Sequence, residues 1–199
     1  MAGKYMIPMK TQGILDSNLV DDMFYKINEI YMHHATLLAF MEGTIQRWDS
    51  SSTIGDIIYK NFSKQTVIES YISFIENFAR AEKVLDDLST KSSFQKFVEQ
   101  CEKETKTKLP LKAQIVKPAQ RIPRYELLLR RLLVNTPKDH PDYEQLQKAE
   151  KAIHDLALRI NSVRESKHEE DLQETLKKLE LLLITDVSNL HGNSFMVDI

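Results

Sequence analysis

The chain has 199 residues and a formal net charge of −2, with 42% of the residues hydrophobic and 28% charged. A chain of this length can bury a core of its own, whereas the small net charge argues against nucleic acid or an acidic membrane as the main partner. No apolar run approaches the roughly 20 residues of a membrane span, and the start, MAGKYMIPMK, lacks the apolar core of a secretory signal. We therefore expect a cytoplasmic protein without direct membrane insertion.

The first half of the chain predicts a series of helices. Over 17–48, apolar residues recur at three- and four-residue steps, which is typical of one helix face, and Ser17 stands where a cap is expected. The polar segment DSSST at 49–53 ends this pattern. Further helices are predicted over 54–62, over 63–88 and, capped by Ser92 or Ser93, over the segment that contains Phe97 and Cys101.

The second half predicts two more helices. One begins after Pro110, a favourable first-turn residue, and stops before NTPKDHPD at 135–142. The other begins at Asp142, with Gln145 placed for a capping box, and continues to about Ile184. Gly is scarce, with 5 residues, and no alternating β pattern occurs. We therefore predict an all-α protein, an elongated antiparallel helical bundle.

Residues that could perform covalent chemistry or hold a metal are sparse. Cys101 is the only cysteine, so no intramolecular disulfide can form, and its acidic setting, FVEQCEKE, disfavours a thiolate. His33 and His34 are adjacent, so on a helix they point to different sides and make a poor metal pair. The sequence contains no phosphate-binding glycine loop and no CxxC, HExxH or GxSxG motif. We expect no cofactor, no metal and no enzyme with covalent chemistry.

The segment IVKPAQRIPRYELLLRRLL at 115–133 combines helical leucine spacing with a row of cations and two prolines. On a helical wheel, one face carries cations and the opposite face is apolar. The cations are Lys117, Arg121, Arg124 and Arg131, and the apolar residues are Leu111, Ile115, Ile122, Leu129 and Leu133. In an ideal helix interior, Pro118 and Pro123 would each cost about 3 kcal/mol. Spacing alone favours a kinked helix with an ordinary solvated face, and a binding face is the alternative.

The stretch VKPAQRIPRYELLL at 116–129 resembles the signature helix of the Dbl-homology domain, L-I-K-P-x-Q-R-I-x-[KR]-Y-x-L-L-L. That family comprises exchange factors for Rho GTPases. IYKNFSKQTVIESYISFIENFARA at 58–81 resembles its second shared segment, and LALRINSVRE at 156–165 resembles the end of its last long helix. RWDSSSTIGDI, FSKQTV and NTPKDHPD are similar to the tumour-endothelial-marker-type branch that is directed at RhoA.

The resemblance implies that a GTPase-binding surface runs along this helix, whose proline-bent course belongs to the shared fold. Arg124 matches the family's Lys or Arg that contacts switch 2 of the GTPase, and Asn161 matches the Asn that meets the same region. The other positions implied to bind the GTPase are Val116, Lys117, Gln120 and Arg121, together with Lys108 and Leu109, where members choose among Rho, Rac and Cdc42. The implied partner is a Rho-family small GTPase, with a RhoA-like protein favoured over Rac or Cdc42.

One shared segment of the family, resembling E-L-x-x-T-E-x-x-Y, has no counterpart in this sequence, and Tyr5–Met9 resembles the stretch that follows it. We therefore predict a Dbl-homology domain at 1–185 that is truncated at its N-terminus and lacks the Glu that meets switch 1. The remaining tail, 186–199, is too short for the family's usual pleckstrin-homology partner, which has ~100 residues.

Three functions stay open on the sequence. The leading one is an exchange factor that accelerates GDP release without covalent chemistry. The first alternative is a GTPase-binding or autoinhibitory pseudo-exchange module. The second is a helical scaffold or membrane-curving bundle, although the net charge of −2 lacks the basic excess expected of the latter. A dimer that covers the face left open by the missing segment is also an alternative.

Overall fold

The structure, a computed structural model, describes residues 2–104 and 109–192, with side-chain surroundings for 3–104 and 109–179. Over these residues the protein is all-α and contains no strand, as predicted. The elements are a π-helical turn η1 (Ala2–Met6), α1 (Ile7–Thr11), α2 (Ser17–Met23), α3 (Ile27–Ile45), α4 (Gly55–Phe62), α5 (Gln65–Ser89), α6 (Ser92–Lys103), α7 (Leu111–Ile115), α8 (Lys117–Val134) and α9 (Tyr143–Gly192).

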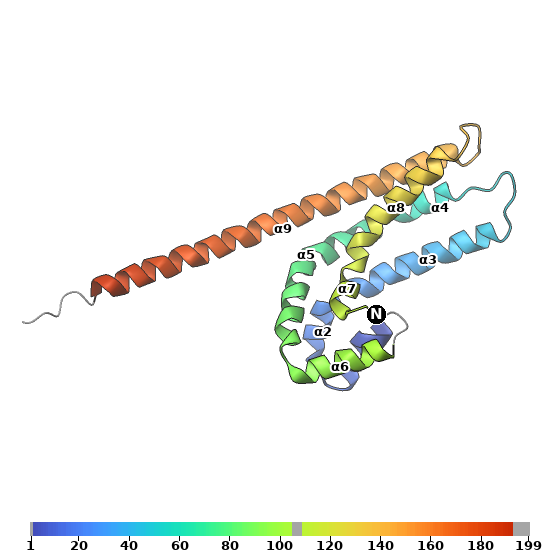
Figure 1. Ribbon diagram of the computed structural model, residues 1–199. Helices are drawn as coiled ribbons and strands as arrows, with labels where there is room; N and C mark the ends of the chain where they lie inside the picture. The colour runs from blue at the N-terminus through green and yellow to red at the C-terminus, as the bar shows by residue number, and fades with distance from the viewer. Residues whose placement is uncertain (1, 105–108, 193–199) are drawn as a thin grey trace, which may run out of the picture. The chain divides into compact units, whose positions relative to one another are not determined.

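The chain divides into two compact units, residues 1–161 and 162–199. In the first unit, α5 is the central helix, because it contacts α2, α3, α4, α6 and α8. Helices α1, α2 and α6 gather at one end of this unit, whereas α4 and the first turns of α9 lie at the other (Figure 1). The core is therefore assembled around a single long helix rather than between two layers.

The predicted helix at 17–48 is broken into α2 and α3. The break lies at residues 24–26, where Lys26 adopts a left-handed conformation with φ of 60°. The predicted cap is also displaced by one residue, because the carboxylate of Asp16, not Ser17, accepts hydrogen bonds from the amides of Asn18 and Leu19. The break redirects α3, so the apolar stripe predicted over 17–48 is only partly buried. Four of its members are at least 48% exposed, namely Tyr31, Leu38, Ile45 and Trp48.

The later helices follow the predicted boundaries closely, and their apolar faces form the core. Five of the six positions that helical spacing predicts for the inward seam of α9 are at most 3% exposed, namely Leu146, Ala149, Ile153, Leu156 and Ile160, whereas Val163 is only partly buried. Cys101 is buried in α6, and burial together with nearby Glu104 raises the pKa of its thiol. A raised thiol pKa is the opposite of what a nucleophilic cysteine needs.

Asp142 does not form the predicted capping box with Gln145. Its carboxylate instead accepts hydrogen bonds from the amides of Ile54 (3.0 Å) and Gly55 (2.9 Å), at the N-terminus of α4. The backbones are so close there that a Cβ on Gly55 would lie 2.4 Å from the amide nitrogen of Leu146. Asp142, just before α9, thus caps α4. The close approach of the two backbones requires a glycine at position 55.

The second unit, taken by itself, holds the continuation of α9, which runs to Gly192 rather than ending near Ile184. Leucines recur here at helical spacing, and those at the positions described are solvent-exposed, with Leu172, Leu176 and Leu179 between 45% and 52% exposed. Of the tail predicted at 186–199, residues 186–192 are helical, and 193–199 lie outside the described residues. No described helix is long and apolar enough to cross a membrane.

Candidate functional site

Helix α8 begins one residue after α7 ends, and this short break accommodates the first of the two prolines. Val116 separates the two helices, so Pro118 occupies the first turn of α8, where a missing N–H costs no intrahelical hydrogen bond. The prediction that Pro118 carries the free-energy cost of a proline in a helix interior is therefore wrong. Pro123 does lie inside α8, so the carbonyl of Ala119 loses its regular partner there.

The two faces of α8 separate as the wheel predicts except at one position. Ile122 and Leu129 are buried but Leu133 is only partly buried, while Lys117, Arg121, Arg124 and Arg131 are exposed. Among the described residues no carboxylate pairs with Lys117, Arg121 or Arg124. Arg121 donates to the Tyr125 hydroxyl (3.2 Å), and Arg124 donates to the side-chain oxygen Oε1 of Gln120 (3.4 Å). The cationic face, by which we mean Lys117, Arg121 and Arg124, thus has its charge available to a partner.

The next cation along α8 behaves differently. Arg130 bridges Glu126 of its own helix and Glu150 of α9, and its Nε lies 3.0 Å from Glu150. His154 of α9 also contacts Glu126, with 2.8 Å between Nδ1 and the carboxylate. These contacts join the C-terminal half of α8 to the first turns of α9. Asn161, farther along α9, is exposed.

The remaining predicted site residues lie around the start of α8. Gln120 is exposed and Val116 is partly exposed. Leu109, just before α7, is 41% exposed. Lys108 lies outside the described residues. The predicted site residues at 116–124 thus lie at the start of α8, whereas Asn161 lies on α9 and Leu109 precedes α7.

A cluster that sequence reasoning missed fixes the inner side of α8. The imidazole of His34 (α3) stacks on the ring of Tyr125, with planes 1° apart and centroids 5.5 Å apart, and its Nδ1 lies 3.1 Å from the Tyr125 hydroxyl. Its Nε2 lies 2.6 Å from the hydroxyl of Tyr71 on α5. Burial, with smaller contributions from Arg121 and His33, lowers the pKa of His34 to about 4, so the ring is neutral at pH 7. The sequence contains one indication of this cluster, because His34 falls in the apolar stripe of its helix.

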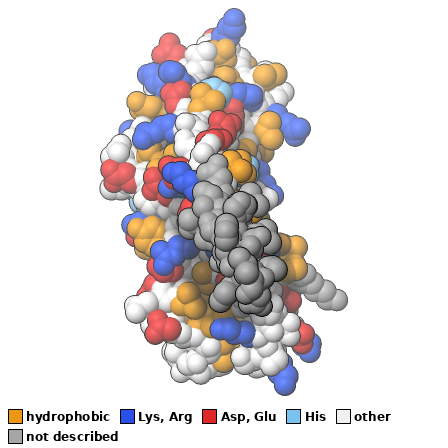
Figure 2. Space-filling view, turned by 90° about the vertical axis from the view of Figure 1, so that its left-hand side faces the viewer, with side chains coloured by type: hydrophobic (Ala, Val, Ile, Leu, Met, Phe, Trp, Pro, Cys, Tyr) orange, Lys and Arg blue, Asp and Glu red, His pale blue; other side chains and the backbone are white. Residues whose placement is uncertain are grey.

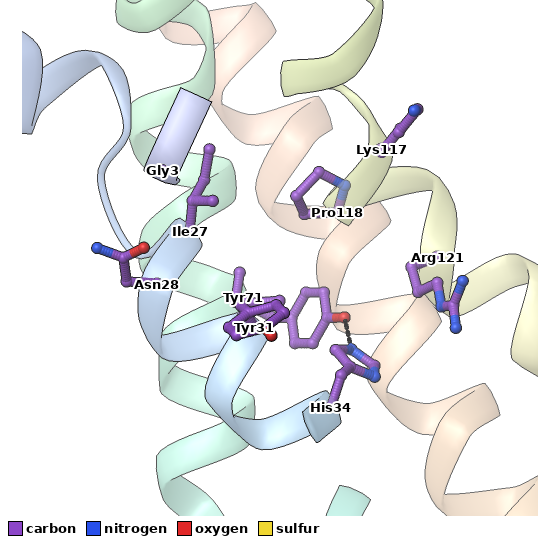
Figure 3. A pocket seen from close by; sticks show the side chains of 10 residues that line it. Gly3, Ile27, Asn28, Tyr31, His34, Tyr71, Lys117, Pro118 and Arg121 are labelled. Atoms are coloured by element: carbon purple, nitrogen blue, oxygen red, sulfur yellow. Dashed lines mark hydrogen bonds between the residues drawn. The ribbon is translucent and has the colours of Figure 1, made fainter. Parts of the chain in front are cut away.

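A pocket of about 600 Å³ lies beside this cluster. In Figure 3, Lys117, Pro118 and Arg121 of α8 line one side, Ile27, Tyr31 and His34 of α3 line the other, and Tyr71 reaches in from α5 to His34. No acidic side chain lines the pocket among the described residues, so its electrostatic character comes from two cations.

The described residues contain no group of three or more His, Cys, Asp or Glu side chains that could hold a metal. On the face that Figure 2 draws, Lys and Arg side chains alternate with Asp, Glu and hydrophobic ones rather than forming one continuous basic area. The arrangement is suited to docking a protein through a few exposed cations and amides.

The comparison with known families decides the class. A family model described as "RhoGEF domain" matches residues 1–161. The chain belongs to the RhoGEF domain family. This confirms the resemblance that the α8 signature predicted, and the matched residues contain the cationic face and Asn161.

RhoGEF relatives and solved structures agree with this assignment. The chain is 36% identical over 183 residues to Rho guanine nucleotide exchange factor osg-1 of Caenorhabditis elegans, a match that covers 90% of this chain and 15% of the relative. It is 38% identical over 161 residues to human Rho guanine nucleotide exchange factor 17, covering 79% of this chain and 8% of that protein. The chain therefore spans a small part of these relatives. The DH/PH domain of human ARHGEF11, solved in a ternary complex with human RhoA and its inhibitor, has the same fold, with a TM-score of 0.76, 19% identity, and coverage of 88% of this chain and 51% of that one.

Proposed function

We propose that this chain is a guanine nucleotide exchange module for a Rho-family GTPase, with a RhoA-like protein as its preferred partner. The observation that carries the proposal is the cationic face of α8, whose charges have no carboxylate partner among the described residues. The face lies on the helix that resembles the family signature, in a chain of the RhoGEF family.

Exchange by such a module is a linkage effect and requires no covalent chemistry. The module binds the nucleotide-free GTPase more tightly than the nucleotide-bound form, and this difference lowers the affinity of the GTPase for GDP. Arg124 and Asn161 supply a charged donor and an amide for the switch 2 region. Lys117, Gln120, Arg121 and Val116 extend the contact along α8.

The preference for a RhoA-like partner rests on two supports. Three segments of the sequence are similar to the RhoA-directed branch, and a structure of the same fold, the DH/PH domain of human ARHGEF11, was solved with human RhoA. Lys108 and Leu109 belong to the region through which selectivity among Rho, Rac and Cdc42 is implied.

The test is release of a fluorescent GDP analogue from RhoA, Rac and Cdc42. We expect the wild-type chain to accelerate GDP release from RhoA. Arg124→Ala should lower the accelerated release rate by at least about tenfold, as for a central charged contact. The Arg124→Ala, Asn161→Ala double variant should not accelerate release. Arg159→Ala is the matched control, because Arg159 is an exposed cation of α9 that lines a separate pocket with Tyr59 and Phe62. It should release GDP at the wild-type rate.

Two outcomes would contradict the proposal. A folded sample that binds nucleotide-free RhoA but does not accelerate release would be a pseudo-exchange module. A sample that neither binds nor accelerates, and instead sediments with liposomes, would be a membrane-associated scaffold.

A further inference from the structure

We propose that Tyr71, His34 and Tyr125 form a hydrogen-bonded relay from α5 through α3 to α8 that holds the cationic face in the orientation needed for exchange. The proposal rests on the proposed function and assigns positioning roles to residues that do not themselves touch the GTPase.

The first step is that α8 is weakened at one point. Pro123 has no N–H, so the hydrogen bond to the carbonyl of Ala119 is missing inside the helix. Prolines in a helix interior are sites of bending. The direction of Arg124, the next residue, is therefore less firmly set by backbone hydrogen bonds than that of a residue in a regular helix.

The second step is that the relay anchors α8 immediately after this point. Tyr125 stacks on His34 with parallel rings and packs against buried Phe62 at a centroid distance of 5.2 Å. His34 contacts the hydroxyls of Tyr125 (3.1 Å) and Tyr71 (2.6 Å) through its two ring nitrogens. One imidazole thus joins α8 to two other helices.

The third step is the direction of the hydrogen bonds. Tyr71 is fully buried, and His34 Nε2 is the one acceptor that its hydroxyl has among the described residues, so the hydroxyl donates to Nε2. A neutral imidazole then carries its proton on Nδ1 and donates to the oxygen of Tyr125. That oxygen also accepts from Arg121, whose guanidinium lies 5.0 Å from the centre of the Tyr125 ring.

The consequence is a chain of contacts that converges on the oxygen of Tyr125. It runs from a buried hydroxyl on α5 through His34 to this oxygen, which Arg121 approaches as a donor from α8, and Arg124 is attached to the backbone next to Tyr125. Removal of the hydroxyl of Tyr71 changes what His34 can accept, and this alters the hold on α8 without removing any atom from α8 itself.

The test uses variants that delete single oxygen atoms, Tyr71→Phe and Tyr125→Phe, with His33→Gln as the matched control. His33 is the neighbouring residue on α3, and its side chain contacts α5 rather than α8, with 3.3 Å between its Nε2 and the Ser70 hydroxyl. GDP release from RhoA is measured at increasing exchange-factor concentration, together with thermal unfolding.

We expect each Phe variant to lower the maximal release rate by about three- to tenfold. The half-saturating concentration should change by less than about twofold, because the orientation of the cationic face matters more in the transition state than in the initial binding of the GTPase. The double variant should lose no more than the stronger single variant, since both act through His34. His33→Gln should release GDP at the wild-type rate. Wild-type maximal rates in both Phe variants, or losses that add independently, would overturn the proposal.

A second measurement does not depend on exchange. In ¹⁵N-labelled protein, the Nδ1 resonance of His34 should be that of the protonated nitrogen, and Tyr71→Phe should shift the backbone amide signals of Arg124 and Tyr125. Unchanged α8 signals would overturn the relay even if exchange occurs. Shifted signals in a protein that does not accelerate release would instead contradict the proposed function and leave the coupling between helices established.

Discussion

His34 is a titratable group held largely out of water, and this makes the stability of the protein depend on pH. Its pKa in the folded protein is lowered to about 4, mainly by burial and then by Arg121 and His33, from an ordinary value of 6.5. The unfolded chain therefore binds more protons between these values. The contribution of His34 to stability is complete above pH 6.5 and is lost as the pH falls toward 4.

We predict that the free energy of unfolding falls by about 2 kcal/mol between pH 7 and 4 from this group, after allowance for solvent screening at the partly exposed ring. His34→Gln, which keeps one donor and one acceptor but does not titrate, should flatten this part of the profile. Urea unfolding followed by circular dichroism at closely spaced pH values measures both slopes. Equal slopes in the two proteins would mean that His34 does not titrate in this window.

The partners of His34 could not be predicted from the sequence. Tyr71 lies 37 residues away and Tyr125 lies 91 residues away. Helical periodicity places His34 on the inner stripe of its helix, but it carries no information on which side chain of another helix lies opposite. The exposed cations are a different case, because solvent exposure follows from the wheel alone, and Lys117, Arg121 and Arg124 were predicted correctly.

At the scale of elements, the contact between α4 and α9 depends on a glycine. We predict that Gly55→Ala lowers the free energy of unfolding by about 2–3 kcal/mol, the usual cost of forcing atoms into a packed site, because its Cβ would lie 2.4 Å from the backbone nitrogen of Leu146. Gly43→Ala is the control: it lies inside α3 with only the Arg47 guanidinium near, at 4.0 Å. It should be stabilised by about 0.5–1 kcal/mol, because alanine loses less backbone entropy in a helix. Urea unfolding of both variants distinguishes the two effects, and similar values would argue against the close approach.

Element boundaries show which sequence signals are reliable. The polar segment at 49–53 and the prolines after α8 end helices where expected, because these residues act on their own backbone. The break at 24–26 was missed, since Lys26 in a left-handed conformation is not a residue that sequence rules associate with a turn. Asp142 was assigned to the wrong helix because a carboxylate can cap any N-terminus that tertiary packing brings to it.

At the scale of the whole molecule, all the described core residues lie at or before Ile160, within the part matched by the RhoGEF family. We predict that a chain ending at Ser166 unfolds with a free energy within about 1 kcal/mol of the full chain, because removing exposed surface residues usually changes stability little. Its exchange rate on RhoA should also be unchanged. A larger loss of stability would mean that residues 167–199 bury apolar surface.

The all-α architecture was predictable because apolar residues recur at helical spacing along the chain, and the family was predictable from the fourteen-residue signature at 116–129 together with two further shared segments. The division of the chain at residues 161 and 162 was not, since α9 continues through it without a proline, glycine or loop to mark the change. The leucines of the second unit repeat with the same helical spacing as the apolar residues of the first. Spacing alone does not tell which apolar stripe packs against another helix.

The cap on α4 also sets an order of events during folding. Asp142 and Gly55 are 87 residues apart, so the hydrogen bond between them closes a long loop and forms only after the intervening helices have come together. Helix α4 has 8 residues, too few to be stable alone. On a ribosome, α4 would leave the exit tunnel long before its cap is synthesised. We therefore expect α4 to become stably folded last, although it lies in the first third of the chain.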